Sequence, residues 1–132
     1  MTTQRAALVI EDDDDIRRLL EIVLQGSGFL VSTAGTGAGG LDLAGQGARY
    51  DLITVDAGLP DIDGTEVVRQ LRTDERMNAR HGRVVMISAR SSASEQSKGL
   101  EAGADAYFTK PFRPSKLRTA LEELLTEPHT EL

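Results

Sequence analysis

The sequence predicts an α/β protein with a doubly wound, five-stranded parallel sheet, (βα)5, and helices on both faces. Five short apolar runs alternate with amphipathic stretches along the 132 residues. This alternation is typical of parallel strands joined by right-handed helical crossovers. The chain length fits one domain. A hydrophobic content of 39% and the absence of cysteine indicate a core that forms without disulfides.

The predicted strands are short runs of aliphatic and β-branched residues. Runs of this kind, bounded by turn-forming or polar residues, are typical of buried strands. They cover Ala6–Ile10, Phe29–Ala34, Leu52–Val55, Val84–Ile87 and Ala104–Phe108.

Helices are predicted where apolar residues recur at helical spacing between and after these strands. The clearest repeats lie in residues 16–24, 64–71 and 114–125, and a weaker one lies in residues 91–104. The stretch Gly35–Gly47 holds six of the thirteen glycines. Because an interior glycine costs a helix about 1 kcal/mol relative to alanine, we expect a short or frayed helix there.

Composition excludes several classes of protein. The lack of cysteine rules out thiol catalysis, cysteine-ligated zinc and iron–sulfur clusters. A net charge of −6 argues against direct nucleic-acid binding by this domain. No apolar run approaches the roughly 20 residues of a membrane span, and no signal-peptide core is present. We therefore expect a cytoplasmic protein without membrane contact, in which His81 and His129 are inert.

Chemically active side chains follow four of the five predicted strands. Glu11 and Asp12 come after the first strand and Asp56 after the third. Ser88 follows the fourth strand, and Lys110 lies just beyond the fifth. Ligands of open parallel sheets bind beyond the carboxyl ends of the strands. We therefore expect these five side chains to meet at one edge of the sheet.

Three clustered carboxylates need a positive counter-charge. Two unit charges about 4 Å apart repel by ~4 kcal/mol at an effective dielectric constant of about 20. Oxygen ligands without histidine or cysteine favour Mg²⁺. A carboxylate beside Mg²⁺, a hydroxyl and a lysine can form an acyl phosphate. Asp56 would be the nucleophile, while Ser88, Lys110 and the metal offset charge on the phosphoryl group.

Four motifs carry a resemblance to a known family. In order they are VIEDDDDIR, YDLITVDAGLPDIDG, VVMISAR and GADAYFTKPF. With these motifs the chain resembles the receiver domain of two-component response regulators over residues 6–125. The resemblance implies a chemotaxis-regulator-like, flavodoxin-like strand order, 2-1-3-4-5. It also implies a receiver domain over residues 1–127. The polar residues 128–132 are expected to form a flexible C-terminal tail.

The resemblance also implies a role for each acidic position. Asp56 matches the aspartate that accepts a phosphoryl group from a histidine kinase or a phosphotransfer protein. Asp12 matches the direct Mg²⁺ ligand, and Glu11 matches the acid that holds metal-bound water. Gly58 matches the position whose backbone carbonyl binds the metal.

The remaining family positions belong to a conformational switch. Ser88 matches the switch hydroxyl, and Tyr107 matches the aromatic residue that changes rotamer. Lys110 matches the lysine that pairs with the phosphoryl group, and the Lys110–Pro111 bond is typically cis in such proteins. The switch would alter the face built from the fourth helix, the fifth strand and the fifth helix. This face would contact a downstream output protein or effector domain. Such a domain is no ordinary enzyme, since it assists only its own phosphorylation and slow dephosphorylation.

Two alternatives stay open. A receiver-like domain can act as an adaptor without accepting phosphate. A dinucleotide-binding domain is the alternative from a different class, because Gly35, Gly37 and Gly40 match GxGxxG after a predicted strand. That second reading leaves Glu11 and Lys110 unexplained. Whether the chain is a single-domain regulator or the receiver part of a longer one also stays open.

Overall fold

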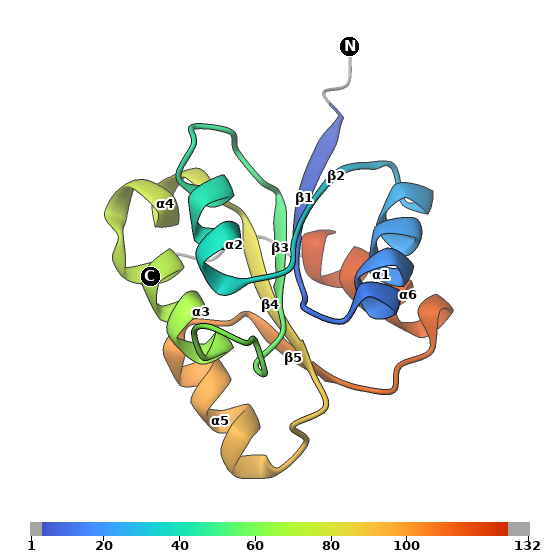
Figure 1. Cartoon of the computed structure of the whole chain (residues 1–132). Helices are drawn as coiled ribbons and strands as arrows, with labels where there is room; N and C mark the ends of the chain where they lie inside the picture. Colours follow the sequence, from blue (N-terminus) through green and yellow to red (C-terminus); the bar gives the residue numbers. More distant parts are fainter. Residues whose placement is uncertain (1–3, 127–132) are drawn as a thin grey trace.

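The computed structural model describes residues 4–126, apart from the side chains of residues 78–80. Its centre is a five-stranded parallel sheet in the order β2-β1-β3-β4-β5 (Figure 1). This confirms the predicted fold class and the strand order that the resemblance implied. The strands are β1 (Arg5–Ile10), β2 (Phe29–Ala34), β3 (Leu52–Val55), β4 (Arg83–Ser88) and β5 (Ala106–Thr109).

Helices cover both faces of the sheet. In Figure 1, α1 and α6 lie together on one side, and α2 to α5 lie on the other. No helix among residues 4–126 is both long enough and apolar enough to cross a bilayer. The bounds are α1 (Asp14–Gly26), α2 (Gly37–Ala44), α3 (Gly64–Thr73), α4 (Glu75–Arg80), α5 (Ala93–Ala102) and α6 (Pro114–Thr126).

Two hydrophobic layers hold the helices to the sheet. On one face, Leu20 and Leu24 of α1 pack with Leu117 and Leu121 of α6. The opposite layer joins β1, β3 and β4 to α3, and every residue of β3 is buried. Burial of one such aliphatic side chain stabilises the fold by about 1.5–3 kcal/mol. The sheet is therefore a rigid base for the loops at its carboxyl edge.

The glycine-rich stretch forms a short helix, as predicted. α2 has eight residues and lies directly on β1. Gly40 is buried there, and a Cβ atom at this position would overlap the Ile10 side chain. Close packing of helix on strand thus explains this glycine.

The segment after α3 differs from the prediction. The sequence predicts no helix between residue 71 and the strand at Val84, but Glu75–Arg80 form the additional short helix α4. Asp74 caps this helix by accepting from the Arg76 and Met77 amides. His81 follows α4 and is buried. Its Nδ1 accepts from the Tyr50 amide at 3.1 Å, and its Nε2 lies 2.8 Å from the Ala44 carbonyl oxygen.

The extra helix shifts the numbering of the later elements. The helices expected as the fourth and fifth are α5 and α6, so the expected output face is α5–β5–α6. β5 begins two residues later than predicted, because Asp105 turns the chain into the sheet by donating its amide to the Val84 carbonyl. The expected tail, residues 128–132 with His129, lies outside the described residues.

Candidate functional site

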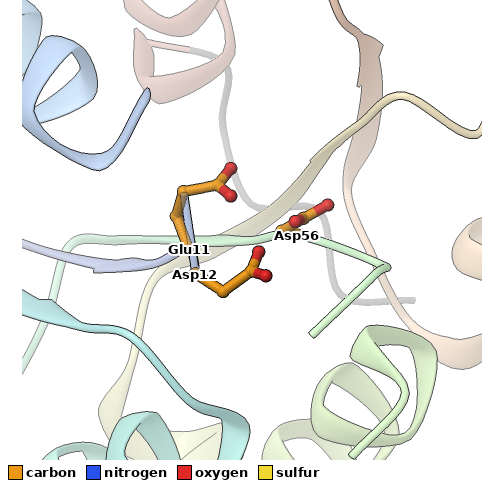
Figure 2. A group of neighbouring side chains, drawn as sticks. All are labelled: Glu11, Asp12 and Asp56. Atoms are coloured by element: carbon orange, nitrogen blue, oxygen red, sulfur yellow. The ribbon is translucent and has the colours of Figure 1, made fainter. Parts of the chain in front are cut away.

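The parallel pairing of β1 with β3 brings the three acids together. Ile10 is in register with Val55, and the Asp56 amide donates to the Ile10 carbonyl at 3.0 Å. Glu11, Asp12 and Asp56 each offer a carboxylate oxygen within 4.8 Å of the others. Figure 2 shows the three carboxylates gathered around one space at the ends of these two strands.

Lys110 reaches this cluster from beyond β5. Its Nζ lies 2.6 Å from Glu11 Oε1 and 3.5 Å from Asp56 Oδ2. The Lys110 amide donates to the Ser88 carbonyl, and the Lys110–Pro111 bond is cis, as the resemblance implied.

The charge balance of the cluster is negative. Glu11 is 1% exposed. Burial raises the pKa of Glu11 to about 7, although the hydrogen bond from Lys110 acts to lower it. Lys110 supplies one ammonium group against three carboxylates, so negative charge remains in excess even though Glu11 is partly protonated near neutral pH. A donor set made only of oxygen atoms with surplus negative charge fits a hard divalent cation such as Mg²⁺.

Asp56 is a buried residue two positions before an exposed glycine. It is 7% exposed, and its Oδ1 accepts from the Gly58 amide at 3.3 Å. Gly58 is exposed, and a Cβ atom there would meet no described atom within 4 Å. The loop then folds back, because the Gly64 amide donates to the Ala57 carbonyl. A Cβ atom at Gly64 would overlap the Asp56 carbonyl oxygen, so this position requires glycine.

Ser88 and Tyr107 are linked through one residue. Ser88 is buried, and its Oγ accepts from the Arg90 amide at 3.1 Å. Tyr107 is half-buried, and its hydroxyl donates to the Arg90 carbonyl at 2.6 Å. Arg90 also donates to Asp63 at 2.9 Å. Neither Arg90 nor Asp63 was predicted to be a site residue. The only signal in the sequence for Arg90 is its position two residues after Ser88.

The glycine-rich loop does not present a free phosphate-binding site. The Gly37 and Ala38 amides at the start of α2 donate to the Asp61 carboxylate at 2.8 and 2.9 Å. The Gly39 amide donates to the hydroxyl of Thr36. An anion from the protein itself thus fills the place that a dinucleotide phosphate would take. This geometry argues against the dinucleotide-binding alternative.

Relatives of known sequence point to one family. The model of the response regulator receiver domain matches residues 7–122. The KDP operon transcriptional regulatory protein KdpE of Escherichia coli is 41% identical over 118 residues, 89% of this chain and 50% of KdpE. The transcriptional regulatory protein AfsQ1 of Streptomyces coelicolor is 38% identical over 124 residues, 94% of this chain and 52% of AfsQ1. The chain spans about half the length of these curated relatives.

Solved structures agree with the sequence relatives. A putative response regulator from Chloroflexus aurantiacus has a TM-score of 0.85 and 30% identity, covering 95% of this chain and 100% of that one. The chemotaxis response regulator CheY4 of Vibrio cholerae has a TM-score of 0.83 and 30% identity, covering 92% and 99%. The chain therefore belongs to the receiver domains of two-component response regulators, a family of signalling domains.

Proposed function

We propose that this domain acts in the cytoplasm as a phosphorylation-controlled switch, with Asp56 as the acceptor of a phosphoryl group from a histidine kinase or a phosphotransfer protein. One observation carries the proposal. The Asp56 carboxylate lies at the carboxyl edge of the sheet between two further acids and the Lys110 ammonium group. This donor set suits a phosphoryl group and a divalent cation together.

Asp56 supplies the nucleophile. One of its carboxylate oxygens forms a bond to phosphorus while the bond from phosphorus to the donor histidine nitrogen breaks. The electron pair stays on that nitrogen, which takes a proton from solvent. Lys110 Nζ, already 3.5 Å from Asp56 Oδ2, offsets the negative charge of the incoming group.

The other acids would hold the cation. We assign Asp12, Asp56 and the Gly58 carbonyl as its ligands, and Glu11 as the acid that orients its bound water. Mg²⁺, when bound, neutralises charge on the phosphoryl oxygens. The surplus of carboxylates over ammonium groups at this edge supports the assignment.

Phosphorylation would then change the shape of the output face. It replaces the Asp56 carboxylate, of charge −1, by an acyl phosphate of charge about −1.5 to −2. Ser88 would turn its hydroxyl toward a phosphoryl oxygen, and Tyr107 would move into the space released. The α5–β5–α6 face would present the change to an output protein or effector domain. Relatives nearly twice the length of this chain carry the names of transcriptional regulators, which supports an effector of this kind.

Intact-mass spectrometry after incubation with acetyl phosphate and Mg²⁺ tests the acceptor. Wild type should gain one phosphoryl group, and EDTA should abolish the gain. Asp56→Asn should gain none, while Asp42→Asn, an exposed change on α2, should behave as wild type. A folded wild type that gains nothing would contradict the proposal and favour the phosphate-independent adaptor.

A further inference from the structure

An ion pair connects the loops that follow β3 and β4. Arg90 lies in the β4–α5 loop (residues 89–92), and its Nη1 donates to Asp63 Oδ2 at 2.9 Å. Asp63 ends the loop that begins at Asp56 and caps α3, with Oδ1 accepting from the Thr65 amide at 2.9 Å. Because the cap fixes Asp63 to a helix packed on the sheet, the pair anchors the β4–α5 loop to a rigid element.

The backbone of Arg90 binds both groups that the proposed switch moves. Its amide donates to Ser88 Oγ, and its carbonyl accepts from the Tyr107 hydroxyl. If Ser88 turns toward a phosphoryl group on Asp56, the first of these bonds must break or Arg90 must follow. If Tyr107 turns inward, the second must break. The position of Arg90 is therefore coupled to both movements.

The surroundings of the pair allow such a movement. The side chains of Arg90 and Asp63 are 41% and 49% exposed. They border a cleft of about 480 Å³ between α3 and α5, which gives the β4–α5 loop space beside it. Although burial acts to raise it, the hydrogen bond from Arg90 holds the pKa of Asp63 below its usual value. The pair is therefore ionised at neutral pH.

We propose that the Arg90–Asp63 ion pair is a latch that holds the β4–α5 loop in its unphosphorylated arrangement and so sets how readily phosphorylation switches the output face. The proposal rests on the proposed function of Asp56. Arg90 and Asp63 are positioning residues, because neither touches the acceptor carboxylate. An exposed ion pair shifts a two-state population by about two- to fivefold. The latch thus adjusts the threshold of the switch without blocking it.

The test follows the state of Tyr107 by ¹⁹F NMR in the full chain labelled with 3-fluorotyrosine. The chain has two tyrosines, so Tyr50→Phe assigns the signals. Beryllium fluoride with Mg²⁺ serves as the phosphoryl mimic in a titration. In Arg90→Gln and in Asp63→Asn, the beryllium fluoride concentration at which half of the molecules have Tyr107 in the switched state should fall about two- to fivefold relative to wild type. Asparagine keeps the capping oxygen of Asp63, so α3 stays intact.

A double-mutant cycle separates the latch from unrelated effects. Arg90 Nη1 also lies 3.8 Å from Glu95 Oε2, so Arg90→Gln removes a second, longer ion pair as well. The double variant should therefore shift the midpoint no further than Arg90→Gln alone, because that variant has already lost the pair with Asp63. Arg69→Gln is the matched control, since it breaks the Arg69–Glu66 pair in the same cleft but within α3. Its midpoint should equal that of wild type. Unchanged midpoints in Arg90→Gln and Asp63→Asn, or additive shifts in the double variant, would overturn the latch.

The mass measurement with acetyl phosphate distinguishes this failure from a failure of the proposed function. If wild type and all variants gain one phosphoryl group but share one Tyr107 midpoint, the latch alone is wrong. If none gains a phosphoryl group and Tyr107 does not respond to beryllium fluoride, both proposals are overturned.

Discussion

The charged groups at the two edges of the sheet differ in how completely they are paired. At the carboxyl edge, Glu11, Asp12 and Asp56 share the single ammonium group of Lys110. At the opposite edge, Asp105 is surrounded by donors. Asp105 Oδ2 lies 2.5 Å from Arg72 Nη2 and accepts from the Val84 amide at 2.8 Å, and Asp105 Oδ1 lies 3.6 Å from Arg83 Nη1.

Other polar groups at that second edge are also matched. The Ala6 amide donates to Asp51 at 2.9 Å, and Arg5 pairs with Glu122 at 2.8 Å. Arg72 also donates to the Gly103 carbonyl, which fixes the end of α3 against the turn before β5. The comparison indicates that the paired charges at the amino edge stabilise the fold, whereas the excess carboxylates at the carboxyl edge are available to bind a ligand. Surplus of this kind costs stability and is typical of functional sites.

The largest expected effect comes from breaking the paired edge. Asp105→Ala should lower the free energy of unfolding by about 3–4 kcal/mol, because it leaves two partly buried guanidinium groups and the Val84 amide without their shared acceptor. Urea denaturation in EDTA measures this. Asp12→Asn is the counterpart at the acidic edge, and it should leave stability unchanged or raised because it removes one of three repelling charges. Equal losses in the two variants would contradict the contrast.

An intermediate effect should follow from the raised pKa of Glu11. In the unfolded chain this carboxyl titrates near 4.5, and in the folded protein near 7. Between these values the folded state keeps a proton that the unfolded state has lost, so stability falls as pH rises. The decline should reach up to about 3 kcal/mol by pH 7 in EDTA. The measured quantity is the difference in unfolding free energy between wild type and Glu11→Gln across this range.

Two controls support the assignment of this pH dependence. Asp15→Asn changes an exposed acid in the first turn of α1 and should keep the wild-type profile. Saturating Mg²⁺ should reduce this loss of stability with rising pH. The cation binds the folded state and favours the ionised form of its carboxylates. A profile that is the same in wild type and Glu11→Gln would show that Glu11 does not carry the effect.

The sequence predicted those parts of the molecule that depend on local pattern and on parallel pairing. The apolar runs set the strands, and the edge rule for parallel sheets placed Glu11, Asp12 and Asp56 together. The helix α4 was missed because six residues are too few to show an amphipathic repeat. The burial of His81 could not be predicted either, since it depends on α4 and on Tyr50, 31 residues earlier.

Contacts between distant loops were beyond prediction from the sequence. Arg90 and Asp63 are 27 residues apart, and neither residue has a periodic pattern that indicates a partner. Asp61 lies 24 residues from Gly37, and nothing in the intervening sequence indicates that the two are in contact. Such contacts depend on how two loops meet after the sheet has formed. Only the structure therefore shows that some acids at the carboxyl edge have their own hydrogen-bond donors, such as Asp61 and Asp63, whereas others share one ammonium group.

The smallest expected effect tests this division at Asp61. Its carboxylate accepts from the Gly37 and Ala38 amides, and these two bonds hold its pKa below the usual value. Its contribution to stability is therefore complete at neutral pH and is lost as pH falls through that lowered pKa. Asp61→Ala should speed amide hydrogen exchange at Gly37 and Ala38 without changing exchange in β3, because the bonds are local to the start of α2. Asp61→Asn should retain part of the protection. Exchange that rises equally in β3 would mean that Asp61 stabilises the whole sheet. Asp61 would then stabilise the entire fold, as Asp105 is expected to do at the opposite edge.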